Sequence, residues 1–202
     1  MTQHAPQDTT ISDTVWLVRF ANGDPEAARV LTIRLAPRAY GLAHRMLGDR
    51  AEAEDIAQEA MLRLWQLAPK WQQDGPAQPA TWLLRVVRNL CIDRLRRMPA
   101  LGIAAGSDAL DTLPNQGPSA EMVLVRKDRA LALDEALAKL PDRQREAIVL
   151  RHLEGCGNAE IAEIMDISIE AVESLLARGK RGLGAQLASR APELGFEDDR
   201  ET

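Results

Sequence analysis

The stretch LPDRQREAIVLRHLEGCGNAEIAEIMDISIEAVESLLARGKRGLGAQL, residues 140–187, combines regular apolar spacing with one sharp turn and decides the class of fold. Pro141 and Asp142 suit the first turn of a helix. The backbone N–H that proline lacks would have no partner at that position, and a negative charge is favourable near a helix N-terminus. We expect a helix over Asp142–Leu153 that stops at Gly155. Its apolar surface should comprise Ile148, Leu150 and Leu153.

A shorter and a longer helix should follow. Asn158 is a plausible N-cap for a helix over Ala159–Met165, and a turn over residues 166–168 leads into a helix over Ile169–Leu187. The expected buried positions are Ile161 and Ile164 on the first of these, and Val172, Leu176, Leu183 and Leu187 on the second. This order predicts a helix-turn-helix that presents side chains to the major groove of DNA, whereas the alternative is a plain helical hairpin in a bundle.

The polar face of the last helix has little net charge. It carries Glu170, Glu173, Ser174, Arg178, Lys180 and Arg181, three cations against two anions. Because neutralisation of phosphates supplies most non-specific affinity for DNA, we expect this module to act together with other binding surfaces.

Bulk composition indicates an all-α protein. Among 202 residues, 46% are hydrophobic and 27% are charged, which is typical of a soluble chain, and strand signals are almost absent. No apolar run reaches the length of a membrane span, and the N-terminus lacks the order of a signal peptide. We therefore expect a cytoplasmic protein with no membrane insertion. Cys91 and Cys156 fit neither a zinc site nor a redox pair, so we expect buried, reduced thiols.

Two helical domains are expected, over residues 1–97 and 120–190. The segment between them, residues 98–119, has three Pro, three Gly, two Asp and no Lys or Arg, which predicts a flexible acidic linker. Residues 191–202 form an acidic tail. Helix signals in the first domain predict four helices, which run from Ser12 or Asp13 to Asn22, from Pro25 to Gly48 with an interruption near Pro37, from Ala51 to Leu67, and from Ala80 to Arg97.

Charge is segregated between two of these helices. Residues 49–59 hold five acids and one Arg, whereas residues 85–97 hold five Arg and one Asp. The acids could simply match a helix dipole. The basic helix also carries Trp82, and surfaces of aromatic and arginine side chains suit unstacked bases and phosphates, although a solvated basic face is the alternative.

Four segments together resemble bacterial sigma factors of the extracytoplasmic-function group. These segments are AEDIAQEAMLRLW (residues 53–65), PATWLLRVVRNLCIDRLRR (residues 79–97), LPDRQREAIVLRHLEG (residues 140–155) and NAEIAEIMDISIEAVESLLARGKRGL (residues 158–183). The resemblance covers about residues 22–97 and 135–187. It implies that the two domains are the sigma region 2 and region 4 domains of that family.

The resemblance also implies roles for individual residues. Binding to core RNA polymerase would fall to Asp55, Gln58, Glu59, Leu64 and Trp65. Binding to the melted −10 promoter element would fall to Trp71, Trp82, Arg85, Arg88, Asn89, Asp93, Arg94, Arg96 and Arg97. The loop over residues 70–78 would take a flipped base, with Trp71 or Trp82 as its stacking partner, although either tryptophan could equally be a core residue.

Reading of the −35 element would fall to the last helix. Its candidate residues are Glu173, Ser174, Ala177, Arg178, Lys180 and Arg181. Arg178 suits a guanine edge or a phosphate, and Glu173 suits a cytosine amino group. Glu170 and Ala171 stand where Gly and Thr are common in the family, and Glu173 where Lys or Arg is common, so we expect a changed −35 sequence or compensating polymerase contacts.

The function implied is that of an alternative sigma factor which initiates transcription of a stress-responsive or signal-responsive regulon. Its partners would be core RNA polymerase, promoter DNA and an anti-sigma factor. A sigma-mimic decoy that titrates an anti-sigma factor is the alternative favoured by Glu173, and an ordinary helix-turn-helix repressor or activator is a third. No enzyme activity, cofactor or metal is expected, because the chain has no glycine-rich phosphate loop and no histidine completes a Glu-x-x-His pair.

Overall fold

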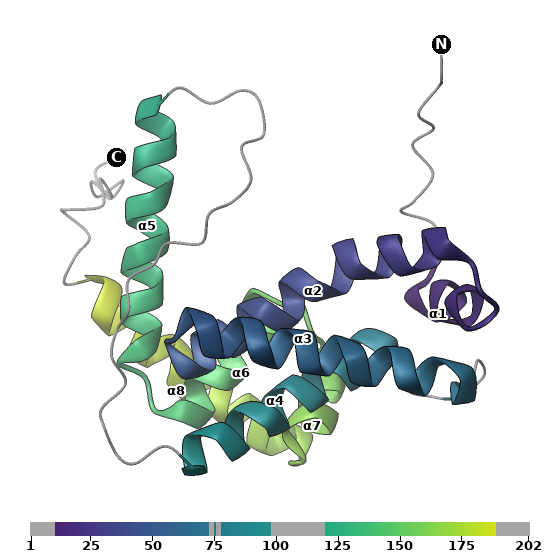
Figure 1. Ribbon diagram of the computed structural model, residues 1–202. Helices are drawn as coiled ribbons and strands as arrows, with labels where there is room; N and C mark the ends of the chain where they lie inside the picture. The colour runs from purple at the N-terminus through teal and green to yellow at the C-terminus, as the bar shows by residue number, and fades with distance from the viewer. Residues whose placement is uncertain (1–10, 73–74, 76–77, 98–119, 189–202) are drawn as a thin grey trace.

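The protein is described by a computed structural model that covers residues 11–72, 75, 78–97 and 120–188. Within these residues all regular structure is helical, which confirms the all-α expectation (Figure 1). The expected linker and tail lie outside the described residues. The helices are α1 (Asp13–Ala21), α2 (Pro25–Leu47), α3 (Arg50–Leu67), a short 3-10 helix (Ala68–Lys70), α4 (Pro79–Arg97), α5 (Ala120–Ala138), α6 (Asp142–His152), α7 (Asn158–Met165) and α8 (Ile169–Ala188).

Polar caps fix where the N-terminal helices begin and end. The carboxylate of Asp24 accepts a hydrogen bond from the Glu26 amide at 3.0 Å, and that of Asp49 accepts from the Glu52 amide at 2.9 Å. Gly48 ends α2 with φ of 71°, a conformation that glycine adopts without the steric cost of a Cβ. The sequence predicts the cap at Asp24 and the end of the helix at Gly48, whereas α3 begins at Arg50, one residue before its expected start, with Asp49 as its N-cap.

The expected interruption of α2 near Pro37 is wrong. The helix runs through Pro37 without a break, although proline removes one backbone donor. Buried side chains line α2 on both sides of this position, with Leu31 and Leu35 before it and Leu42 after it, all at most 1% exposed. Packing of this long apolar face against α3 and α4 therefore outweighs the local cost of the proline.

The N-terminal unit, α1–α4, surrounds α2 with the other three helices. Its fully buried side chains include Leu17, Leu31, Leu35, Leu42, Leu64, Leu83 and Leu84. Arg34 fastens α1 to α2, since its guanidinium donates to the carbonyl of Ile11 at 2.9 Å and pairs with Asp13 at 3.2 Å. The unit thus holds α3 and α4 side by side (Figure 1).

The C-terminal unit, α5–α8, contains the expected helix-turn-helix. Asp166 ends α7 with φ of 54°, and the Ser168 hydroxyl accepts from the Ala171 amide at 3.3 Å at the start of α8. The expected core residues Ile161, Ile164 and Val172 are fully buried. The tight turn therefore holds α7 and α8 against a common core.

Two local expectations in this unit are wrong. The N-cap of α7 is Gly157 and not Asn158, because the Glu160 carboxylate reaches back to accept from the Gly157 amide at 2.7 Å. Leu153, expected on the apolar face of α6, lies at its C-cap and is 39% exposed. Both errors concern helix ends, where a shift of one residue changes the direction of a side chain.

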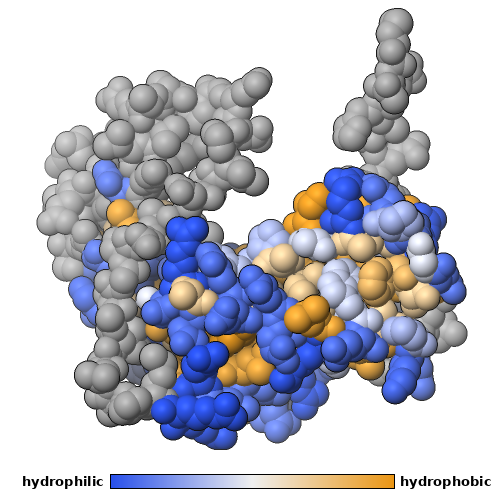
Figure 2. Space-filling view, viewed as in Figure 1, coloured by the Kyte–Doolittle hydropathy of each residue, from blue (hydrophilic) through white to orange (hydrophobic). Residues whose placement is uncertain are grey.

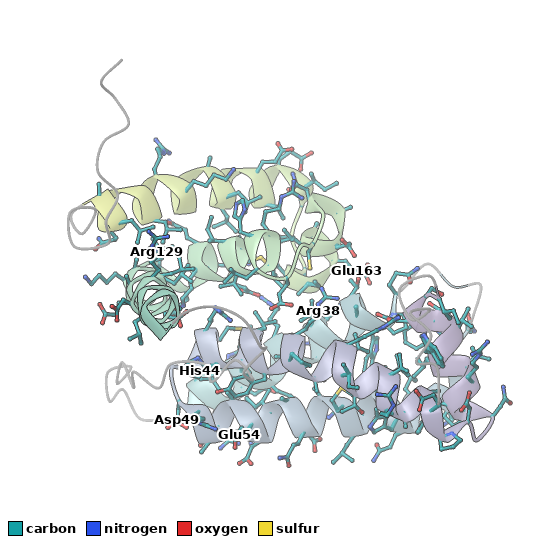
Figure 3. The ribbon with its side chains drawn as sticks, turned by 90° about the horizontal axis from the view of Figure 1, so that it is seen from above. Arg38, His44, Asp49, Glu54, Arg129 and Glu163 are labelled. Atoms are coloured by element: carbon teal, nitrogen blue, oxygen red, sulfur yellow. The ribbon has the colours of Figure 1, made fainter. Side chains whose placement is uncertain are left out.

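The two units pack directly on one another. Helix α4 lies against α7 and α2 lies against α6, and buried apolar residues of both units form one continuous cluster. Figure 3 shows the units as two layers with Arg38 at their boundary. The geometry of any site on α4 therefore depends on the C-terminal unit.

Helix α8 approaches α6 most closely at Gly179. A Cβ built there would lie 2.6 Å from Cγ1 of Ile148, whereas a Cβ at Gly184, further along the same helix, would meet nothing within 4 Å. We predict that Gly179→Ala lowers the free energy of unfolding by about 1 to 3 kcal/mol through overpacking. Gly184→Ala should raise it by up to about 1 kcal/mol through helix propensity. Urea unfolding of both variants measures the difference, and equal effects would contradict the close packing of α6 on α8.

Candidate functional site

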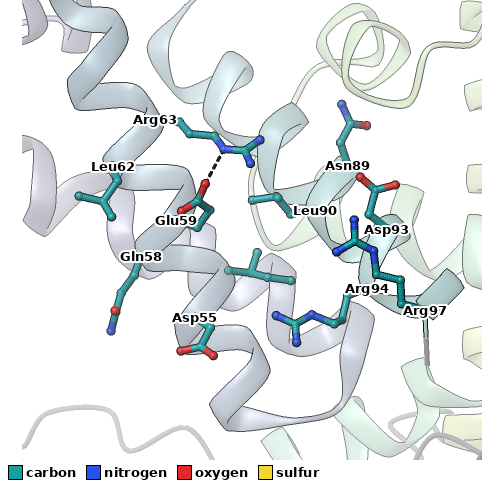
Figure 4. Close-up of a pocket in the computed structure, with 11 residues that line it drawn as sticks. Asp55, Gln58, Glu59, Leu62, Arg63, Asn89, Leu90, Asp93, Arg94 and Arg97 are labelled. Atoms are coloured by element: carbon teal, nitrogen blue, oxygen red, sulfur yellow. Dashed lines mark hydrogen bonds and ion pairs between the residues drawn. The ribbon is translucent and has the colours of Figure 1, made fainter. Parts of the chain in front are cut away.

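A groove runs between α3 and α4 on the N-terminal unit (Figure 4). Acidic, amide and apolar side chains come from α3, whereas an amide, an acid and arginines come from α4. The lining residues are Asp55, Ile56, Gln58, Glu59, Leu62, Arg63, Asn89, Leu90, Asp93, Arg94 and Arg97. The groove thus joins the two surfaces for which the sequence predicts separate roles.

The α3 wall of the groove is open to solvent. Asp55, Gln58 and Glu59 are exposed, and Glu59 pairs with Arg63 at 2.8 Å. Leu62 is 54% exposed beside them. The α3 wall, defined by these five residues, therefore combines negative charge with one exposed apolar side chain.

The structure does not support a direct contact by Leu64. This side chain is fully buried in the core of the N-terminal unit, and the exposed leucine of α3 is Leu62, which the sequence analysis missed. The helical spacing of Ile56, Ala60 and Leu64 already placed Leu64 on the buried face, so periodicity held the signal that identifies Leu62. Trp65 is half-buried, with its ring centroid 4.4 Å from that of Phe20.

The basic face of α4 is partly exposed and partly paired. Exposed side chains at the predicted positions are Arg85, Asn89, Asp93, Arg96 and Arg97. Arg94 pairs with Glu52 of α3 at 2.6 Å, a contact between the two oppositely charged helices. Arg94, Arg96 and Arg97 lie in the last turn of α4, where cations are favourable to the helix dipole, whereas Arg85 lies in its first half.

Arg88 differs from the other arginines of α4 because it faces the C-terminal unit. Its Nε lies 2.5 Å from Oε1 of Glu146 on α6, and the two side chains are only 13% and 5% exposed. Burial raises the pKa of the Glu146 carboxyl, and its pairing with Arg88 only partly offsets that effect. A pair 58 residues apart in the sequence leaves no local pattern, so sequence analysis had no signal for it.

The two candidate stacking residues contact each other. Trp71 and Trp82 form an edge-to-face pair with ring centroids 6.5 Å apart, and both pack on the hydrophobic cluster while remaining half-buried. The predicted loop between them lies partly outside the described residues. Beside it, the Thr14 hydroxyl donates to Oε1 of Gln78 at 3.3 Å. Each ring is thus both a packing element and partly accessible.

The polar face of α8 is turned to solvent. Five of the six predicted positions are exposed, namely Glu173, Ala177, Arg178, Lys180 and Arg181, whereas Ser174 is half-buried. Glu170 also lies on this helix, and a hydrogen bond from Ser168 lowers the pKa of its carboxyl. The face presents charges of both signs at the start of the second helix of a helix-turn-helix.

Ion pairs cross the boundary between the units, and three of them have the same direction of charge. Arginines of the N-terminal unit pair with carboxylates of the C-terminal unit. The pairs are Arg38 with Glu154 at 3.1 Å, Arg45 with Asp134 at 3.4 Å and Arg88 with Glu146 at 2.5 Å. The Thr81 hydroxyl also donates to Oε1 of Glu160 at 3.1 Å. We name these four contacts the interdomain contacts.

Other kinds of site find no support in the described part of the chain. It holds no group of three or more His, Cys, Asp or Glu side chains placed to bind a metal ion. None of its helices has the length and apolarity needed to cross a membrane. Figure 2 shows a largely hydrophilic surface with apolar patches over the N-terminal helices.

Comparison with known families matches both units separately. The model of Sigma-70 region 2 matches residues 31–98, and the model of Sigma-70 region 4 matches residues 130–183. The first covers α3 and α4 with most of α2, and the second covers α6, α7 and most of α8 with the end of α5. The groove and the polar face of α8 therefore lie inside the two matched regions.

Curated relatives span nearly the whole chain. The ECF RNA polymerase sigma factor SigW of Bacillus subtilis is 34% identical over 173 residues, which cover 82% of this chain and 91% of the relative. The ECF RNA polymerase sigma factor SigM of Mycobacterium tuberculosis is 31% identical over 176 residues, covering 87% and 85%.

Two solved structures share the fold. CnrH, in complex with the cytosolic domain of CnrY, aligns with a TM-score of 0.62 at 23% identity, covering 89% of this chain and 99% of that one. The sigma factor RpoE of Bartonella quintana, in complex with the anti-sigma factor NepR, aligns with a TM-score of 0.58 at 20% identity, covering 78% and 94%.

Both cysteines are free and buried, as the sequence predicts. Burial raises the pKa of Cys91 to about 12 and that of Cys156 to about 11. Because the thiolate is the reactive form, both thiols should resist a disulfide reagent at pH 8 in the folded protein and react once urea unfolds it. An added thiol at an exposed position, Gln66→Cys, should react at once under the same conditions. Rapid labelling of the native thiols would contradict their burial.

Proposed function

Because the chain belongs to the extracytoplasmic-function group of RNA polymerase sigma factors, we propose that it binds core RNA polymerase and starts transcription at promoters with −10 and −35 elements. The observation that carries this proposal is the groove, in which an acidic and apolar helix lies beside a basic one. Under this proposal, a surface for a protein partner and a surface for DNA would lie side by side on the N-terminal unit. The genes it serves would form a stress-responsive or signal-responsive regulon.

The α3 wall is the proposed docking surface for the polymerase. Exposed apolar side chains ringed by charged ones are typical of the centre of a protein interface, and Leu62 has this setting. Asp55, Gln58 and Glu59 would form the polar rim around it. Trp65 is half-buried with its ring packed on Phe20, and its exposed part would contribute to this surface.

The exposed side chains of α4 are the proposed contacts to the melted −10 strand. Arginines neutralise phosphates, while Trp71 and Trp82 offer partly accessible rings for a base. The exposed face of α8 is the proposed reader of the −35 duplex, in the manner of a recognition helix in the major groove. Because Glu173 accepts hydrogen bonds, we propose a base with an exocyclic amino group opposite it.

An anti-sigma factor is the proposed regulator. Two solved structures that share this fold are complexes, one of CnrH with the cytosolic domain of CnrY and the other of RpoE with the anti-sigma factor NepR. By analogy, a protein inhibitor would cover the α3 wall of this chain and exclude the polymerase. Its action would be cytoplasmic and would require no covalent chemistry by the sigma factor itself.

A sigma-mimic decoy is the second candidate. The exposed carboxylate of Glu173, on the helix proposed to read DNA, is the observation that favours it. A decoy would bind an anti-sigma factor but direct no promoter-dependent transcription. The exposed arginines of α4 favour the sigma factor, because a decoy has no need of a phosphate-binding helix.

Truncation of Leu62 tests the polymerase surface. We predict that Leu62→Ala weakens binding to core RNA polymerase by about 1 to 2 kcal/mol, or roughly fivefold to thirtyfold, through loss of apolar contact. Ile33→Ala removes an equally exposed apolar side chain from α2 and should leave affinity unchanged. Fluorescence anisotropy with labelled protein measures both. Equal affinities of the two variants for core RNA polymerase would mean that the polymerase binds a surface other than the α3 wall.

Footprinting of the complex with polymerase on a promoter tests the two DNA surfaces. Arg97→Ala on α4 should reduce reactivity of unpaired thymines near −10 to permanganate while leaving upstream protection in place. Arg178→Ala on α8 should reduce the upstream protection while leaving the permanganate reactivity near −10 in place, because each arginine contacts a different element under this proposal. If both variants lose both signals together, or neither changes a signal, the assignment of one element to each helix is wrong.

A further inference from the structure

We propose that Ile169 reads the methyl group of a thymine in the −35 element and determines promoter specificity together with Glu173. This inference deepens the proposed function and rests on its assignment of α8 to the −35 duplex. It adds a residue that the sequence analysis did not single out.

Ile169 is the first residue of α8, and its side chain is 44% exposed. The core takes its neighbours instead, since Ile167 packs on the hydrophobic cluster and Val172 is fully buried. Ser168 holds the first turn in place, because its hydroxyl accepts from the Ala171 amide and its carbonyl accepts from the Val172 amide at 3.1 Å. Ile169 therefore projects from a fixed turn at the end of a recognition helix that contacts base edges.

One face of α8 carries Ile169, Glu173 and Ala177, because residues four apart lie above one another on a helix. All three are exposed. Ala177 has no side chain beyond its Cβ, so the helix can approach a partner closely at that point. Along the helix, this face offers an apolar group, a carboxylate and a small residue.

Positive charge is missing from the start of α8. The chain has no Lys or Arg between Arg151 and Arg178, while Glu170 and Glu173 place two carboxylates in the first two turns of the helix. Neutralisation of phosphates cannot supply affinity there, and the cations of this helix begin only at Arg178. The first two turns therefore contribute to binding through base edges.

The main apolar group on base edges in the major groove is the C5 methyl of thymine. Other groups there are hydrogen-bond donors and acceptors, which contact with Ile169 would leave without water or a partner. Glu173 in turn suits an amino group of cytosine or adenine. Four residues of a helix rise about 6 Å and stacked bases lie about 3.4 Å apart, so the thymine lies within about two base pairs of the base opposite Glu173.

The first test compares the parent protein with Ile169→Ala, each combined with core RNA polymerase. The template is a promoter that the parent uses in a pool of genomic fragments, with its −35 element randomised, and transcript sequencing gives the base preferences. The parent should prefer thymine roughly threefold to tenfold at one position, within about two base pairs of the position that Glu173→Lys alters. Ile169→Ala should lose this preference and keep the others.

The second test replaces that thymine by deoxyuridine, which removes the methyl group alone. Transcription by the parent should fall roughly threefold to tenfold, whereas Ile169→Ala should transcribe both templates equally. Ile33→Ala removes another exposed apolar side chain, on α2, and should keep the parent's sensitivity to uracil. Urea unfolding checks that Ile169→Ala keeps the stability of the parent, as expected for an exposed position.

Three results would overturn the methyl contact. Equal sensitivity of the parent and Ile169→Ala to uracil, or no preference for thymine, would do so while leaving a sigma factor that starts transcription at promoters. Loss of transcription by Ile169→Ala from every −35 sequence, with weaker binding to core RNA polymerase, would assign Ile169 to a protein interface instead. Absence of any promoter-directed start by the parent would overturn the proposed function and this inference with it.

Discussion

The buried pair of Arg88 and Glu146 is the constraint on which the arrangement of the two units depends. Moving two charges out of water costs free energy. Their mutual attraction in the protein interior offsets this cost only when the two groups are in close contact. The apolar cluster that spans the units supplies the attraction between them. The ion pairs then select one orientation, because a rotation of the C-terminal unit on the N-terminal unit would leave a buried charge without its partner.

This constraint divides the functional surfaces into two groups. The α3 wall and the polar face of α8 are exposed in the same structure in which Arg88 is covered. A partner that binds the α3 wall therefore does not require the units to separate first. A ligand that uses the guanidinium of Arg88 would first have to displace Glu146, so the α3 wall and this part of α4 differ in accessibility.

Most local structure was predictable from the sequence, because it depends on neighbours. The cap at Asp24, the turn at Asp166 and the apolar spacing of α8 each involve residues within one or two turns. Pro37 is an exception. The lost backbone hydrogen bond is a local cost to the helix, but the packing that outweighs it comes from α3 and α4. Whether a helix continues through a proline thus depends on packing between helices, which the neighbouring residues do not show.

The candidate site was only partly predictable for the same reason. The sequence places Arg88 on the basic helix but cannot place Glu146 beside it, because the two meet only when the units pack. Leu62 and Leu64 differ by two positions and share their chemistry, yet one is 54% exposed and the other is buried. Here the helical period was informative, and resemblance to a family was the poorer guide to which leucine is exposed.

Run-off transcription tests the central claim most directly, with core RNA polymerase, a pool of promoter fragments and this protein added or withheld, followed by sequencing of the transcript starts. The account predicts new starts that share two motifs spaced upstream, with a −35 motif that changes when Glu173 is replaced by Lys. Binding to core polymerase or to an anti-sigma factor without any new start would contradict it and favour the decoy.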